Sequence, residues 1–177
     1  MPNQFTKLAR AAIENYTRTG KIMDSPDKLP PELSTEKSGV FVTLESGSGH
    51  KLRGCIGTYL PTKPNIAEEI IANAISAASE DYRFPPLKSK ELDDLHITVS
   101  LLQKPEQVKS LKELDVKKYG VIVKTKDGRS GLLLPDIDTV KTPEEQVAIA
   151  AQKGGIDLEE DNIYLFRFEV IKHSDET

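Results

Sequence analysis

The sequence predicts an α+β protein with a mostly antiparallel sheet flanked by helices. Three observations support this fold class. Strand-like segments come in neighbouring pairs joined by short turns, segments with helical periodicity lie between those pairs, and 177 residues suffice for one domain with a sizeable core. We therefore expect residues 1–177 to form a single domain, with room for a larger lobe and a smaller sub-lobe.

The first half of the chain begins with a helical pattern that spans residues 5–16 and ends at Gly20. An irregular, proline-rich connection follows over residues 21–33. Residues 39–46 and 51–60 alternate in the manner of strands, and the Gly-Ser-Gly-His turn between them predicts a hairpin. A second helix is expected from Thr62 to about Glu80, because the prolines in DYRFPP prevent its continuation.

The second half begins with a strand predicted over residues 95–102, where β-branched side chains are frequent. Residues 119–135 read as another hairpin, with Asp127-Gly128 at its turn. A hydroxyl cap at Thr142, the proline that follows it and Glu145 three residues on predict the start of a third helix. Gly154-Gly155 ends that helix, and residues 162–173 are expected to form one last strand.

Composition and charge exclude several classes of function. The net charge is −4, which does not suit a protein held on nucleic acid by charge alone. A single cysteine and three scattered histidines offer no metal-ligand spacing, so we expect no metal and no cofactor. The chain has no run of about 18 apolar residues and its first residues lack the apolar core of a signal peptide, which predicts a cytoplasmic protein without a membrane segment.

LRGCIG, residues 52–57, contains the only cysteine, between two glycines. Strand alternation places Leu52, Gly54 and Ile56 on the core face and Arg53, Cys55 and Gly57 on the opposite face. Arg53 then lies about 6–7 Å from Cys55 along the strand, close enough to favour a thiolate, while the glycines leave space for a ligand. The alternative is a small, half-buried cysteine without chemistry of its own.

A nucleophilic cysteine needs a base, and the histidines are the first candidates. His50 is a poor one, because it has the wrong strand parity and lies roughly 16 Å away at strand rise. His96 shares a polar strand face with Thr98 and Ser100 and could meet Cys55 across the fold, although a lone strand histidine is more often solvent-facing. His173 belongs to the C-terminal tail, where exposure is expected.

DYRFPP, residues 81–86, is the second unusual segment. Asp81 and Arg83 flank a helix end, and Phe84-Pro85-Pro86 forms a rigid, apolar turn. Such a turn can hold one carboxylate and one guanidinium in place for an anionic or polar ligand. The alternative is a helix-terminating loop that Phe84 anchors and whose charges are solvated.

Taken together, LRGCIGT, DYRFPPL, HITVSLL, GLLLPDI and QKGGI, in this order and spacing, resemble the AMMECR domain family over roughly residues 5–172. The resemblance implies a two-lobed fold and a cleft around the family's recurrent residues, which match Arg53, Gly54, Cys55, Gly57, Asp81, Arg83, Phe84 and Pro85. Many members carry a second cysteine where this chain reads Ala151-Gln152-Lys153, and a tryptophan in the last strand that is absent here.

The resemblance does not imply an established activity. Microbial members are often encoded beside, or fused to, a Memo-like protein of the extradiol-dioxygenase type and a radical SAM protein, which implies a shared system. Three functions therefore stay open. The chain is a binding module that works through the cleft, an enzyme in which Cys55 is the nucleophile or redox thiol with Asp81 or His96 moving protons, or a nucleic-acid-associated factor, which its acidic balance disfavours.

Overall fold

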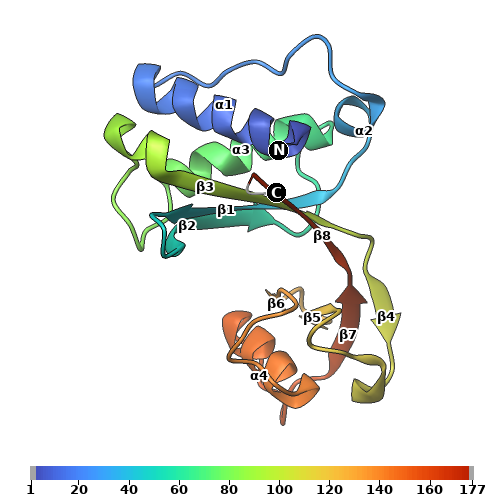
Figure 1. The fold of residues 1–177 in the computed structure, drawn as a ribbon. Coiled ribbons are helices and arrows are strands. Elements are labelled where there is room, and N and C mark those ends of the chain that lie inside the picture. The colour runs from blue at the N-terminus through green and yellow to red at the C-terminus, as the bar shows by residue number, and fades with distance from the viewer. Residues whose placement is uncertain (1–2, 176–177) are drawn as a thin grey trace. The chain divides into compact units, whose positions relative to one another are not determined.

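The structure, a computed structural model, describes residues 3–175 and has the α+β architecture with antiparallel sheets that the sequence predicts (Figure 1). It divides into two compact units. The first contains the chain up to Leu102 and the segment from Ile171 onward, and the second contains Gln103–Val170. None of the helices in the described residues is long and apolar enough to cross a membrane.

The first unit is a four-stranded sheet with two helices packed against one of its faces (Figure 1). Its strands run in the order β2-β1-β3-β8, so that β2 and β8 are the edges. The elements of this unit are α1 (Gln4–Thr19), α2 (Pro31–Ser34), β1 (Gly39–Ser46), β2 (Lys51–Thr58), α3 (Ile66–Ser79), the 3₁₀ turn η1 (Ser89–Asp94), β3 (Leu95–Leu102) and β8 (Val170–Ser174).

Local signals set both ends of α1, and its end at Gly20 is the one that the sequence predicts. The side chain of Asn3 accepts hydrogen bonds from the main-chain N–H groups of Phe5 and Thr6. At the other end, Gly20 adopts φ 71°, the left-handed conformation that terminates helices at little cost for glycine. The buried stripe between these caps packs against α3 and β3.

The helix predicted from Thr62 begins four residues later, at Ile66. The main-chain N–H groups of Thr62 and Lys63 donate instead to the carboxylate of Glu69, each at 2.7 Å, and Asn65 caps the helix. Burial alone would raise the pKa of Glu69, but hydrogen bonds from the hydroxyls of Thr58 and Thr62 and from these N–H groups lower it. A buried carboxylate with four donors thus ties the end of β2 to α3.

The β1–β2 hairpin departs from simple alternation at a bulge. Leu44 pairs with Gly54 and Glu45 pairs with Leu52, so Arg53 is the extra residue. The prediction that Leu52 faces the core is therefore wrong: the side chain is 42% exposed. Because the bulge adds one residue to the strand, each residue before it points to the face opposite to the one that simple alternation predicts.

The second unit is also a four-stranded antiparallel sheet, in the order β4-β7-β5-β6, with one helix against it. Its elements are β4 (Glu106–Val108), η2 (Leu111–Glu113), β5 (Gly120–Thr125), β6 (Ser130–Leu133), α4 (Pro143–Lys153) and β7 (Ile163–Phe168). Thr142 and Glu145 form the predicted capping box of α4. The single last strand expected over residues 162–173 is wrong, because it divides at Glu169 into β7 and β8, which belong to different sheets.

Candidate functional site

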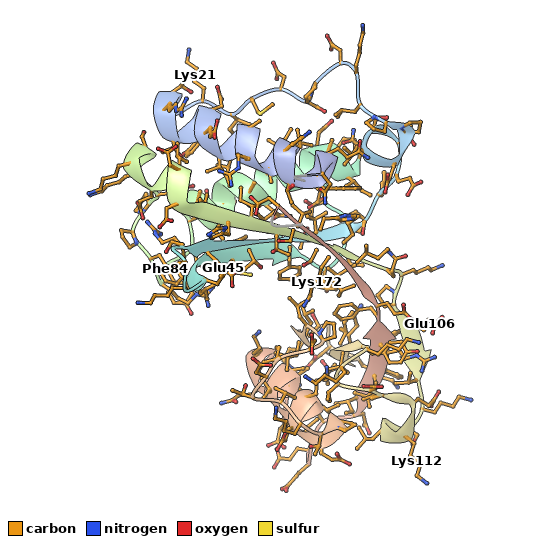
Figure 2. All side chains as sticks on the ribbon, in the orientation of Figure 1. Lys21, Glu45, Phe84, Glu106, Lys112 and Lys172 are labelled. Carbon is orange, nitrogen blue, oxygen red and sulfur yellow. The ribbon has the colours of Figure 1, made fainter. Side chains whose placement is uncertain are left out.

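The two segments that the sequence singles out meet at the outer edge of β2. Arg53 and Cys55 lie on this edge strand, and the loop that follows α3 brings Asp81, Arg83 and Phe84 against it. Phe84 lies near the end of the hairpin that carries Glu45 (Figure 2). We call this group of five residues the Asp81 cluster.

Asp81 is the centre of the cluster. Its carboxylate accepts the main-chain N–H of Cys55 at 2.9 Å and two bonds from the guanidinium of Arg83, at 2.9 and 2.7 Å. The hydrogen bonds from Arg83 are the main cause that holds the pKa of the Asp81 carboxyl well below its usual range, although burial acts in the opposite direction. A buried carboxylate so firmly ionised is suited to holding its neighbours in place, and poorly suited to carrying a proton.

Arg53 has its own carboxylate partner. Its guanidinium donates two hydrogen bonds to Glu91 of η1, at 2.8 and 3.2 Å, and its side chain is only 12% exposed. These bonds are the main cause of the lowered pKa of Glu91. The charge that was expected to favour a thiolate at Cys55 is thus already balanced by Glu91.

Phe84 lies within cation–π distance of both arginines. Its ring centroid is 5.9 Å from Cζ of Arg53 and 5.5 Å from Cζ of Arg83. The main-chain N–H of Phe84 donates to the carbonyl of Asp81, which closes the turn, and Pro85 is exposed just after it. The DYRFPP segment is thus an ordered turn built around one aromatic ring.

Cys55 is half-buried, and its Sγ lies 3.3 Å from the hydroxyl of Thr43, the residue opposite it on β1. His96 is on the same sheet face, but it pairs with Glu45 on the far side of β1. Two strand spacings and two residue steps put its Cα about 12 Å from that of Cys55. The ring of His50 lies against that of His96, with centroids 4.5 Å apart and planes tilted by 31°, so neither histidine is placed as a base for the thiol.

The two glycines of LRGCIG make room for the protein itself. A Cβ on Gly54 would lie 2.2 Å from the carbonyl oxygen of Ala77, because α3 crosses the strand there. A Cβ on Gly57 would lie 2.2 Å from the ring of Phe41. Gly54 therefore allows α3 to pack closely on β2. At Gly57 the ring of Phe41 fills the space of a side chain, so only the main chain of this residue is left for other contacts.

Three participants were missed from sequence. Glu91 and Thr43 carry no local signal, because each is paired with its partner only through the strand register and the path of the chain after α3. Tyr82 lies inside DYRFPP and is 96% exposed, beside the buried Asp81. Among residues 3–175 no group of three or more potential metal ligands comes together.

Comparisons with known proteins place this chain in a family. The AMMECR1 family model matches residues 6–173. A Thermotoga maritima protein is 52% identical over 169 residues, which is 96% of each chain. A Clostridium acetobutylicum protein, CA_C1420, is 44% identical over 172 residues, but the match spans 97% of this chain and only 36% of that protein.

The fold also matches a solved structure. The crystal structure of uncharacterized protein PH0010 from Pyrococcus horikoshii superimposes with a TM-score of 0.86 at 38% identity, over 97% of this chain and 90% of that one. Sequence and structure agree over nearly the full length described. This chain belongs to the AMMECR1 family.

Proposed function

We propose that this chain is a binding module which recognises a partner protein through the Asp81 cluster and Tyr82, and that Cys55 packs there without reacting. One observation carries the proposal. A single buried carboxylate holds both the guanidinium of Arg83 and the main chain of Cys55, so a 44% exposed arginine is fixed in position before any partner arrives. Such pre-organisation lowers the entropy cost of binding.

The exposed side chains suit an interface. Tyrosine and arginine are the residue types that most often dominate protein–protein binding energy, and here Tyr82 and Arg83 are adjacent. Tyr82 at 96% exposure contributes nothing to the core of the chain, so folding does not explain an aromatic residue at this position.

The identity of the partner rests on the family resemblance. It implies a shared system with a Memo-like protein and a radical SAM protein, and the cleft expected around the cluster would be a groove that such a partner helps to form. The Clostridium acetobutylicum relative supports joint action, because its matching region is part of a chain nearly three times as long. A module that is joined to, or acts with, a second protein needs an exposed recognition surface.

The enzyme alternative is that Cys55 is a nucleophile or redox thiol. The structure offers its sulfur one side-chain hydroxyl, that of Thr43, while both nearby arginines are engaged by carboxylates. Alkylation by iodoacetamide between about pH 5 and 10 tests it, against a free thiol with a pKa near 8.5. A rate whose midpoint lies well below that value supports the enzyme, and slow alkylation supports the binding module.

The binding proposal is tested by calorimetry of the purified chain with a Memo-like protein and a radical SAM protein from the same genome. Tyr82→Ala and Arg83→Ala should each weaken binding at least tenfold, about 1.4 kcal/mol, whereas Cys55→Ser should leave it unchanged. Tyr164→Ala and Arg18→Ala, the same two changes at exposed positions elsewhere in the chain, control for general effects. Loss of binding in Cys55→Ser with retention in Arg83→Ala contradicts the proposal, as does a wild-type chain that binds neither protein.

Nucleic-acid binding remains a third candidate that the net charge of −4 disfavours. If it occurred through phosphates, affinity for single-stranded RNA would fall steeply between 50 and 200 mM salt. Absent or salt-insensitive binding of RNA removes this alternative.

A further inference from the structure

We infer that the partner presents an extended polypeptide segment, which adds to the free edge of β2 and bonds to the main chain of Cys55 and Gly57. This inference rests on the proposed function and names the form of its partner. Its basis is the direction of the main-chain N–H and C=O groups of β2, some of which point away from the sheet.

The direction of these groups follows from the Asp81 contact. β2 is an edge strand, and its inner side pairs with β1. The N–H of Cys55 donates to Asp81, so it points away from β1. In an antiparallel ladder the N–H and C=O of one residue point to the same side, and that side alternates along the strand. The C=O of Cys55 and both main-chain groups of Gly57 therefore also point outward.

Asp81 occupies the position that an added strand would take at the N–H of Cys55. Its carboxylate oxygen is the acceptor for that N–H at 2.9 Å. The next outward donor along the edge is the N–H of Gly57, and within residues 3–175 it has no acceptor. Gly57 is half-buried, and the ring of Phe41 fills the space that its side chain would take, so this residue offers only its main chain at the strand edge. One residue of an extended segment can bond to the C=O of Cys55 and the N–H of Gly57 together.

The two halves of this edge differ in their protection. Proteins block edge strands with charged residues, bulges and covering side chains. The part of β2 up to Cys55 has all three, in the exposed Lys51, the bulge at Arg53 and the carboxylate of Asp81. The half that contains Gly57 has neither bulge nor charge. An extended segment therefore has one place to begin, beside Asp81 and next to Tyr82 and Arg83.

The inference is tested with peptides. Random heptapeptides displayed on phage are selected on the immobilised wild-type chain, with removal of those that also bind Arg83→Ala. Synthetic forms of the selected peptides are then N-methylated at each main-chain nitrogen in turn. Strand addition predicts that methylation weakens binding tenfold or more at every second position and little at those between, because only alternate N–H groups face β2.

Amide hydrogen exchange of the chain with bound peptide locates the contact. The amide of Gly57 should slow at least tenfold, while those of Ile56 and Thr58, which already bond to β1, stay slow, and that of Gly49 in the turn stays fast. Gly57→Ala is avoided, since its Cβ would collide with Phe41. The inference is overturned if no peptide is selected, or if methylation weakens binding without alternating along the peptide. It is also overturned if the bound peptide slows amide exchange in another strand.

These outcomes are separate from those of the proposed function. If Arg83→Ala weakens binding of the whole partner protein but no peptide protects Gly57, the module binds a folded surface, and only the inference falls. If Arg83→Ala binds the whole partner as the wild type does, the proposed function itself falls.

Discussion

The main-chain N–H of Cys55 donates a hydrogen bond of 2.9 Å to Oδ2 of Asp81, although 26 positions separate the two residues. This bond connects the edge of β2 to the loop after α3. Because the same carboxylate also holds Arg83, it joins the two segments that the sequence singles out into one surface.

Replacement of the Asp81 carboxylate should destabilise the chain, and more so for alanine than for asparagine. Asp81→Asn keeps an acceptor for the Cys55 N–H but loses the ion pair, and should lower the free energy of unfolding by about 1–3 kcal/mol. Asp81→Ala also leaves that N–H without its partner and should cost about 2–4 kcal/mol. Urea unfolding at pH 7 measures both, with Asp138→Ala at an exposed position as the control.

Acid provides a second measurement of the same residue. The lowered pKa of Asp81 means that its ionised form stabilises the folded state above the ordinary carboxyl pKa near 3.8, and that this contribution is lost as the pH falls further. The stability gap between the wild type and Asp81→Asn should therefore narrow below about pH 4. A gap that stays constant down to pH 2 would contradict the assigned ion pair.

Gly54→Ala should disturb the packing of α3 on β2. Its Cβ would lie 2.2 Å from the carbonyl oxygen of Ala77, a main-chain atom that cannot move without the helix. We expect a loss of about 1–3 kcal/mol in the free energy of unfolding. Gly49→Ala, at a position with no heavy atom within 4 Å of the added Cβ, should change it by less than about 0.5 kcal/mol. Equal effects of the two substitutions would contradict this role of Gly54.

The C-terminal strand should loosen in mild acid through His173. Its ring stacks on Phe5 at 4.0 Å, and burial lowers its pKa from the ordinary value of 6.5. The unfolded chain then takes up the proton first as the pH falls below about 6.5, so stability present above that pH is lost on acidification.

His173→Phe keeps a stacked ring without a proton to gain. Urea midpoints of both chains at pH 7.5 and 5.0 provide the comparison. The wild type should lose more stability between the two pH values than His173→Phe does. An equal loss in both chains would place the titration elsewhere.

Several features of the fold could be predicted from the sequence because their signals are local. The C-terminal cap of α1 at Gly20 and the N-terminal cap of α4 at Thr142 each depend on residues within one helical turn. The turn at Asp127-Gly128 and the two-residue period of the strands are equally short-range. Together they determined the α+β class, and the quoted motifs identified the segments that carry the candidate site.

Predictions failed where one residue changed the register or where two local preferences competed. The bulge at Arg53 reversed the face of Leu52, although the segment was correctly recognised as a strand. The last strand divides at Glu169 because its halves belong to different sheets, and hydrophobic periodicity does not show which sheet a strand joins. Helix α3 begins later than predicted because the N–H groups of Thr62 and Lys63 donate to the carboxylate of Glu69.

The sequence by itself determined which segments form the candidate site, and the tertiary structure decided which contacts their residues make. Arg53 was expected beside Cys55 and instead pairs with Glu91, while Asp81, expected to face a ligand or move a proton, binds the Cys55 main chain and Arg83. The physical reason is that a charged side chain near the core must pair with an opposite charge or a hydrogen-bonding group. Which group lies within about 3 Å depends on the long-range path of the chain. That partner is set by strand order and loop course, which no local pattern encodes.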